Sequence, residues 1–106
     1  AGGAQTTGAQ NTFIGFEAGG STTTGSRNTA VGNLALDDGF TTEGDNTAVG
    51  HQAMGGSAVG NGAEFNTVVG SLALDALTTG DSNSIIGYTA GTAKTIQSLV
   101  IWQEML

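Results

Sequence analysis

One eight-residue motif, Asn-Thr-x-(Val/Ile)-Gly-x-x-Ala, recurs five times in this chain and constrains its fold more than any other feature. The copies begin at Asn11, Asn28, Asn46, Asn66 and Asn83, and a serine replaces the threonine in the last copy. The starting asparagines follow one another by 17, 18, 20 and 17 residues. A nearly fixed period of this length is typical of a solenoid, in which each repeat adds one unit to a stack. The sequence therefore predicts a rod or a surface rather than a domain built around one catalytic pocket.

The motif itself predicts a short strand followed by a turn. Positions are counted from the asparagine, which is position 0, so that position 3 is always Val or Ile, position 4 always Gly and position 7 always Ala. In a strand, positions 1 and 3 share one face and position 2 takes the other. Both faces are then at least partly apolar, so we expect the strand to be covered on both sides, with the Val/Ile column facing the core. We expect the glycine to end the strand with a sharp turn or bulge, and the alanine to mark a close contact.

A sixth, partial copy at residues 56–63 has glycine in place of asparagine and divides the step of 20 residues into two steps of ten. The sequence thus suggests a ten-residue coil, with the segments around Thr-Thr-Gly added as acidic surface loops. The expected repeat domain is 1–91, with repeat cores near 11–19, 28–36, 46–54, 56–64, 66–74 and 83–91. The expected core residues are Ile14, Val31, Val49, Val59, Val69, Ile86, Ala18, Ala35, Ala53, Ala73 and Ala90. The expected turn glycines are Gly15, Gly32, Gly50, Gly60, Gly70 and Gly87.

The composition indicates that the chain shares its core with other chains. Apolar residues make up 38% of the sequence, but only four Phe, one Trp and one Tyr are present, so the core of a single chain would be thin. The net charge of −7 lacks the basic footprint of nucleic-acid binders and disfavours anionic membranes. The absence of cysteine excludes disulfides, and no apolar run is long enough to span a bilayer. Because the sequence opens in mid-repeat, we expect it to be a fragment of a longer protein.

The last residues, 92–106, differ from the repeats and are expected to form a cap or a linker to a following segment. They contain no glycine and include a run of bulky apolar side chains. A capping strand from Ser98 to Trp102 and the start of an amphipathic helix through Ile96, Leu99, Val100 and Leu106 both fit this run. Open repeat ends need such caps.

The units Asn28-Thr29-Ala30-Val31-Gly32 and Asn46-Thr47-Ala48-Val49-Gly50, each followed by x-x-Ala, resemble the head repeats of YadA-like trimeric autotransporter adhesins. With their Thr-Thr-Gly segments they look closer still to the repeats of bacteriophage tail fibres, and the resemblance covers roughly residues 1–91. It implies a left-handed parallel β-roll in which three chains wind side by side. The constant apolar position would then face the roll core, and small residues would let the chains approach.

Residues that could carry chemistry are sparse, and we expect no catalytic, cofactor-binding or metal site. His51 is the only histidine, which excludes a triad and a multi-histidine zinc site within one chain. The acidic run from Asp37 to Asp45 lacks the calcium-binding spacings, so a solvated loop is favoured. The segment from Gly87 to Thr95 does not satisfy the phosphate-loop pattern. The chain is therefore not expected to be an enzyme.

Two binding hypotheses remain beside a structural role. The threonines suggest an ice-binding face, although adjacent threonines point to opposite sides of a strand and the position 1 column shares a face with the Val/Ile column that is expected to be buried. The aromatic residues Phe16, Phe40, Phe65 and Tyr88 suggest a glycan surface, although such rings more often pack over a loop base. Neither pattern is as specific as the repeat.

The sequence therefore predicts a structural segment of a homotrimeric extracellular fibre, from a phage tail fibre on a virion or from an adhesin on a bacterial surface. Such a segment would project a receptor-binding or adhesive tip. Its expected partners are two further copies of itself and a host-surface glycan or protein, met through the loops or a distal tip, with no nucleic acid and no membrane insertion. The alternative is a monomeric β-solenoid that binds ice or a polysaccharide through a repeated face.

Overall fold

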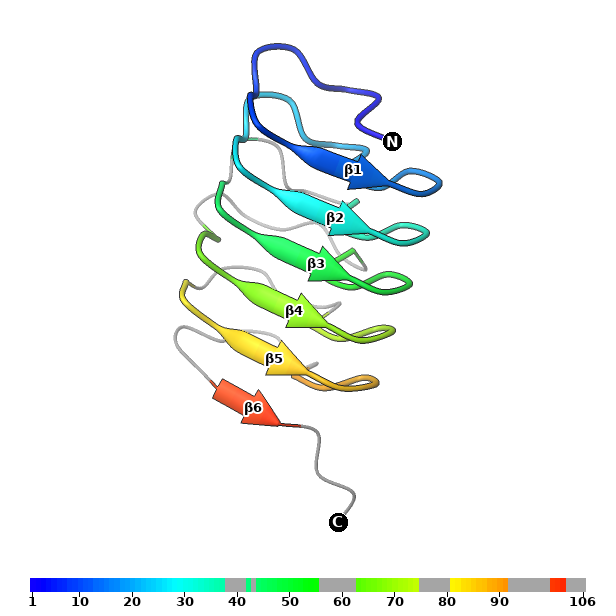
Figure 1. Ribbon diagram of the computed structural model, residues 1–106, viewed down its shortest axis with the longest axis vertical. Coiled ribbons are helices and arrows are strands. Elements are labelled where there is room, and N and C mark those ends of the chain that lie inside the picture. The colour runs from blue at the N-terminus through cyan, green and yellow to red at the C-terminus, as the bar shows by residue number, and fades with distance from the viewer. Residues whose placement is uncertain (38–41, 43, 56–62, 75–80, 92–99, 103–106) are drawn as a thin grey trace.

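The protein folds as a parallel β-solenoid with one continuous sheet (Figure 1). The computed structural model describes residues 1–37, 42, 44–55, 63–74, 81–91 and, for the course of the backbone only, 100–102. Within these residues the strands are β1 (Thr12–Ile14), β2 (Thr29–Val31), β3 (Thr47–Val49), β4 (Thr67–Val69), β5 (Ser84–Ile86) and β6 (Val100–Trp102). No helix occurs among the described residues. The predicted fold class, an all-β parallel solenoid, is confirmed.

Adjacent strands pair in parallel and in register, so that each motif position forms a column along the stack. Thr29 pairs with Thr47, Ala30 with Ala48 and Val31 with Val49, and the same correspondence holds from β1 to β5. The strand β6 continues the sheet beside β5, with Ile101 opposite Ile85. The strand alternative for the tail is therefore correct at residues 100–102.

The core is lined by positions 2, 7 and 8 of the motif. Position 2 supplies fully buried side chains from β2 to β5, and the position 2 residue of β1, Phe13, packs partly buried against them. The position 7 alanines are buried in every complete copy of the motif, and position 8 adds the fully buried Leu36, Met54 and Leu74. The core residues at position 2 are Ala30, Ala48, Val68 and Ile85, and those at position 7 are Ala18, Ala35, Ala53, Ala73 and Ala90.

The Val/Ile column was expected to face the core, but it lies outside the core that this chain forms by itself. Ile14 is 58% exposed, Val69 37% and Ile86 39%, while Val31 and Val49 are half-buried. Strand alternation allows only one of positions 2 and 3 to point inward, and the return path of the coil covers the position 2 face. The Val/Ile column therefore lies on the outer face of the sheet. Val59, assigned to the same column, lies outside the described residues.

The proposed ten-residue coil is also wrong, because one coil takes a full repeat. The strands β3 and β4 pair directly, although Asn46 and Asn66 are 20 residues apart. This direct pairing leaves no place in the sheet for a further strand between them, and parallel strands need a connection of about a dozen residues or more to return to the same edge. Ala63, from the partial copy near 56–64, is buried in the core, whereas residues 56–62, including Gly60, lie outside the described residues.

The Thr-Thr-Gly segments, expected as surface loops, form the return wall of the coil where the structure describes them. The carbonyl of Thr23 accepts hydrogen bonds from the backbone of the preceding coil at Thr6 (2.9 Å) and Gly8 (3.3 Å). The Arg27 N–H donates to the Ala9 carbonyl at 3.0 Å. Thr22 is fully buried. Because backbone groups inside a fold need partners, each coil bonds its neighbour on this wall as well as in the sheet.

A buried asparagine ladder runs along the stack at position 0. The Oδ1 atom of each asparagine accepts the backbone N–H of the next one, at 2.8 Å from Asn28 to Asn11 and at 3.0 Å from Asn46 to Asn28. The same bond joins Asn66 to Asn46 at 3.1 Å and Asn83 to Asn66 at 3.0 Å. The constant asparagine thus supplies the backbone partner at the corner where each coil enters its strand.

The constant glycine directly follows each strand and permits the close approach of successive coils. Gly15, Gly32, Gly50, Gly70 and Gly87 all have a positive φ between 122° and 139°. A Cβ on Gly32 would lie 2.6 Å from the carbonyl oxygen of Gly50 in the next coil. Any other residue would be strained by the backbone conformation and would also collide with the backbone of the next coil.

Candidate interaction surface

The outer face of the sheet, which carries the Val/Ile column, is a regular surface that runs from β1 to β5. Position 1 places a hydroxyl column beside the apolar one, and both columns follow the in-register strands. The hydroxyl column is exposed at Thr12, Thr67 and Ser84 and half-buried at Thr29 and Thr47. We call this surface the outer face. It consists of these hydroxyl residues together with Ile14, Val31, Val49, Val69 and Ile86.

The position 1 threonines were expected to be unavailable for binding because they share a face with a buried Val/Ile column. In the structure both columns lie on the outside of the coil, so the threonines are available for binding. The apolar column continues from one coil to the next, and contiguous exposed apolar surface is typical of interaction sites, so the outer face is a candidate interaction surface. The outer face can contact another apolar surface through the methyl groups and can donate hydrogen bonds from the hydroxyls.

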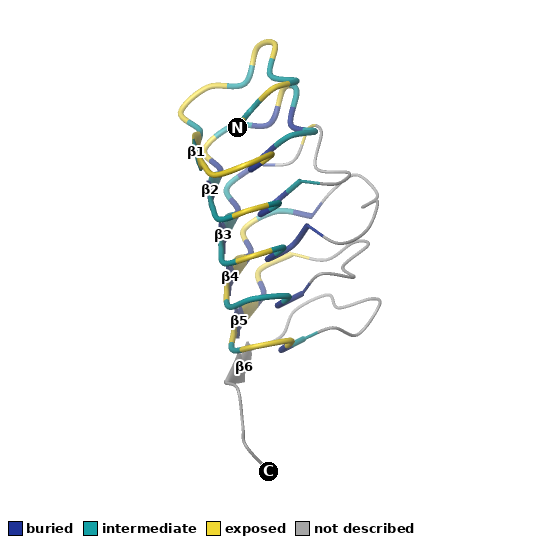
Figure 2. Cartoon of the chain, turned by 90° about the vertical axis from the view of Figure 1, so that its right-hand side faces the viewer, coloured by how far each residue is buried: buried dark blue, intermediate teal, exposed yellow. Residues whose placement is uncertain are grey.

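A second row of side chains lies on the turns that follow the strands, at position 5, and all of them are exposed except the half-buried Ser71. The turn row, as this set is called below, is Phe16, Asn33, His51, Ser71 and Tyr88. Phe16 is 67% and Tyr88 65% exposed. Figure 2 looks onto these turns and shows exposed and half-buried residues at the same place in successive coils. The turn row therefore presents two aromatic rings at its ends and polar groups between them.

Hydrogen bonds between the coils hold the turn row in register. The carbonyl of each of the first four row residues accepts the N–H of position 6 in the next coil, at 2.8 Å from Leu34 to Phe16 and 2.9 Å from Gln52 to Asn33. The corresponding bonds to the carbonyls of His51 and Ser71 measure 2.8 and 3.0 Å. The row is thus as regular as the sheet, although its side chains vary.

The acidic side chains do not gather into a metal site among the described residues. No group of three or more His, Cys, Asp or Glu side chains is placed to hold a metal ion in this part of the chain. Of the acidic run, Asp45 forms a two-fold ion pair with Arg27 of the preceding coil, at 2.7 and 2.8 Å. Asp38 and Glu43 lie outside the described residues. So do residues 92–95 of the segment from Gly87 to Thr95 that was compared with a phosphate loop.

The Arg27–Asp45 pair shifts the titration of both groups. The hydrogen bond from the guanidinium, followed by its charge, holds the pKa of Asp45 below its ordinary value of 3.8. The same hydrogen bond and the carboxylate charge raise the pKa of Arg27. Both groups are on the surface, so this pair links two coils without forming a buried charge site.

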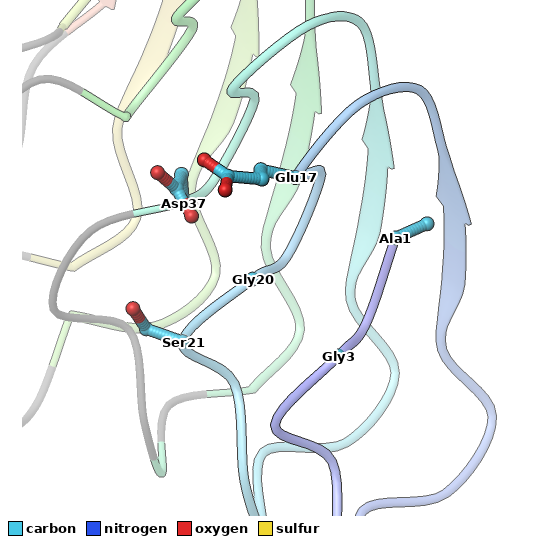
Figure 3. A pocket seen from close by; sticks show the side chains of 6 residues that line it. All are labelled: Ala1, Gly3, Glu17, Gly20, Ser21 and Asp37. Atoms are coloured by element: carbon cyan, nitrogen blue, oxygen red, sulfur yellow. The ribbon is translucent and has the colours of Figure 1, made fainter.

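A hollow near the start of the chain brings two carboxylates together (Figure 3). The Glu17 side chain extends toward Asp37 of the next coil, and the remaining lining comes from Ala1, Gly3, Gly20 and Ser21. The Ser21 N–H donates to the backbone carbonyl of Asp37 at 3.1 Å. The hollow therefore gathers the carboxylates of Glu17 and Asp37 and the hydroxyl of Ser21.

The aromatic residues named from the sequence do not form one surface. Phe16 and Tyr88 belong to the turn row, whereas Phe65, which is 59% exposed, precedes the asparagine at position −1 and lies on another corner of the coil. Phe40 lies outside the described residues. Sequence reasoning grouped these residues only as aromatic and did not recognise the alignment of Phe16 and Tyr88 at position 5, which depends on the register between coils.

No protein-family model matches the chain, and neither a curated protein nor a solved structure matches it. Among the described residues, no helix has the length and apolar character needed to cross a membrane.

Proposed function

We propose that this chain is a rigid segment of a homotrimeric extracellular fibre, in which three copies associate through the outer face. The observation that carries the proposal is the apolar Val/Ile column, which the chain's own coil leaves exposed at Ile14, Val69 and Ile86 and half-buried at Val31 and Val49. A second copy of the chain is the natural partner because its own column has the same length and the same spacing. In this assembly the side chains at positions 1 and 3 of the three sheets pack against one another.

The energetics of the core support assembly. The largest fully buried side chains in the described part of the chain are Leu36, Met54, Leu74, Ile85 and Val68, which give each coil little apolar volume. Full burial of one Val or Ile side chain contributes about 1.5–3 kcal/mol. Five such residues on each of three chains can offset association costs of about 4–15 kcal/mol, even though part of their surface is already covered. Folding and assembly would then be coupled.

The backbone arrangement suits a mechanical role. The sheet, the asparagine ladder and the return wall bond each coil to the next at three places around its circumference. A stack bonded in this way resists bending and can extend by adding further coils. We assign the segment the task of projecting a receptor-binding or adhesive tip from a virion tail fibre or a bacterial surface.

The alternative function is a monomeric solenoid that binds ice or a polysaccharide through a repeated face. The specific observation in its favour is the exposed hydroxyl column beside the Val/Ile column, because a regular lattice of hydroxyl and methyl groups is suited to a periodic ligand. This role and the trimer compete for the same outer face. A chain that buries the outer face in an assembly cannot present it to ice.

Sedimentation equilibrium of the chain at several concentrations separates the two functions. The fibre proposal expects a trimer, and it expects Val69→Asp to produce smaller species because a carboxylate is then placed in the apolar contact. The matched control is Asn33→Asp, which adds a carboxylate to the exposed turn row two coils away from Val69 and should leave the trimer intact. A folded monomer of the unsubstituted chain would refute the fibre proposal.

A further inference from the structure

We propose that the turn row binds a neutral linear polysaccharide, with one sugar ring stacked on Phe16, another on Tyr88, and the sugar hydroxyls between them bonded to the polar side chains of the row. The inference goes beyond the fibre proposal and does not need three chains. It requires only that the turn row remain outside the contact between chains.

The spacing of the row is the first argument. Neighbouring strands in a sheet are about 4.8 Å apart, so the four steps from Phe16 to Tyr88 span roughly 19 Å. The coil-to-coil hydrogen bonds at 2.8–3.0 Å fix this spacing along the row. One step is close to the length of one pyranose unit in an extended glycan. A linear oligosaccharide lying along the stack would therefore meet one row residue with each sugar unit.

The chemistry of the row is the second argument. Sugar rings present C–H groups on their faces and hydroxyls at their edges, so a site for them combines aromatic rings with neutral hydrogen-bonding groups. The rings of Phe16 and Tyr88 are both about two-thirds exposed and offer large apolar faces. Asn33, His51 and Ser71 supply an amide, an imidazole and a hydroxyl, which together can donate and accept hydrogen bonds. This combination is absent from the outer face, which has no aromatic ring at β1 to β5.

The charge distribution selects a neutral ligand. The chain carries a net charge of −7, and Glu17 lies directly after the first aromatic residue of the row. Among the described residues the only Lys or Arg is Arg27, which is paired with Asp45 at position −1 and away from the row. An anionic polysaccharide would therefore be repelled, whereas a neutral one would not.

The backbone of the row is already fixed before binding. Position 4 glycines and positive-φ residues such as Glu17 and Gln52 define the turn, and each turn is bonded to the next coil. A site that is held in this way loses little conformational entropy on binding, which favours affinity for a flexible chain molecule.

The test is isothermal titration of the chain with cellohexaose, xylohexaose and mannohexaose, beside polygalacturonate as the anionic probe. We expect at least one neutral hexaose to bind, and the double variant F16A/Y88A to weaken that binding at least tenfold. The control is Phe65→Ala, which removes an equally exposed ring outside the row and should leave the affinity unchanged. His51→Ala, a change at the centre of the row, should weaken binding without affecting the rings.

Three results would overturn the inference: no binding of any neutral hexaose, binding of polygalacturonate alone, or an equal loss of affinity in the Phe65→Ala variant. Sedimentation of the same samples separates this inference from the fibre proposal. A monomer that binds a hexaose through the row refutes the trimer alone. If F16A/Y88A instead dissociates the trimer, the row is part of the contact between chains and the glycan assignment is wrong.

Discussion

The size of the side chain at position 2 is compensated by position 8 of the same coil. Coils with a large residue at position 2, Phe13 or Ile85, have glycine at position 8, whereas the coil with Ala30 has Leu36 there. A Cβ on Gly19 would lie 2.6 Å from the ring of Phe13, and one on Gly91 would lie 2.5 Å from Cδ1 of Ile85. Four of the five coils therefore pair one large with one small residue at these two positions, whereas the coil of β4 buries both Val68 and Leu74.

This compensation predicts a coupled pair of substitutions in the coil of β2. Ala30→Ile alone overfills the core beside Leu36 and should destabilise the fold by about 1–3 kcal/mol. Leu36→Gly alone leaves a cavity and should cost about 2–5 kcal/mol. The double variant reproduces the arrangement of Ile85 and Gly91. Its loss in free energy of unfolding, measured with urea, should be smaller than the sum of the losses of the two single variants. Strict additivity would show that positions 2 and 8 do not share one space.

The ion pair of Arg27 and Asp45 predicts a dependence of stability on pH. Because the folded-state pKa of Asp45 lies below its ordinary value of 3.8, the pair stabilises the folded chain above that pH, and this contribution disappears as the pH falls further. Asp45→Asn preserves the shape and tolerates the positive φ of 61° at this position. The difference in melting temperature between the two proteins should be largest near neutral pH and vanish in acid; a difference that persists at pH 2 would contradict the assignment.

At the scale of the structural elements, the sequence predicts the strands and their parallel order but not the face that each strand buries. Positions 1 to 3 are polar, apolar and apolar, so alternation alone leaves two orientations open. Which face is buried depends on position 8, where Leu36, Met54 and Leu74 pack in the core on the same side of the sheet as the position 2 side chains. These residues stand just beyond the constant motif, and their large size was the available signal.

The ten-residue unit failed for a related reason. The partial copy at 56–63 matches the motif in its letters, yet a parallel coil must also return across its full width. The segment that contains Thr22 and Gly25 provides this return, with its side chains and glycines packed against the neighbouring coils. Of the partial copy, Ala63 is buried in the core, and residues 56–62 lie outside the described residues. The alignment of the turn row was equally out of reach, since it follows from the register of complete coils.

The turn after each strand predicts a contrast between two glycine substitutions. Gly32→Ala forces an alanine to a φ of 133° and places its Cβ 2.6 Å from the Gly50 carbonyl oxygen, so we expect a loss of about 1–3 kcal/mol or more in the free energy of unfolding. Gly3→Ala is the matched control, because a Cβ there meets nothing within 4 Å. The comparison requires only thermal and urea unfolding of both variants. Equal tolerance of the two substitutions would contradict the close approach of the coils.

At the scale of the whole molecule, the chain combines a rigid, repeatedly bonded stack with an outer face that its own fold leaves open. The thin core and the uncovered Val/Ile column point in the same direction, toward association with further copies. The turn row lies beyond the strand ends and gives the same stack a second, chemically different surface. A fibre segment built in this way would separate assembly on the sheet from recognition on the turns.

The central claim is that copies of the chain meet through the Val/Ile column, and site-directed disulfide formation tests it most directly. The natural sequence contains no cysteine, so Val49→Cys on the outer face and Asn33→Cys on the turn row each introduce a single thiol. After mild oxidation of dilute protein, the account predicts that Val49→Cys gives a covalent dimer on a denaturing gel, because two of the three thiols in a trimer can join, while Asn33→Cys remains monomeric. Failure of Val49→Cys to cross-link, or equal cross-linking by both variants, would contradict it.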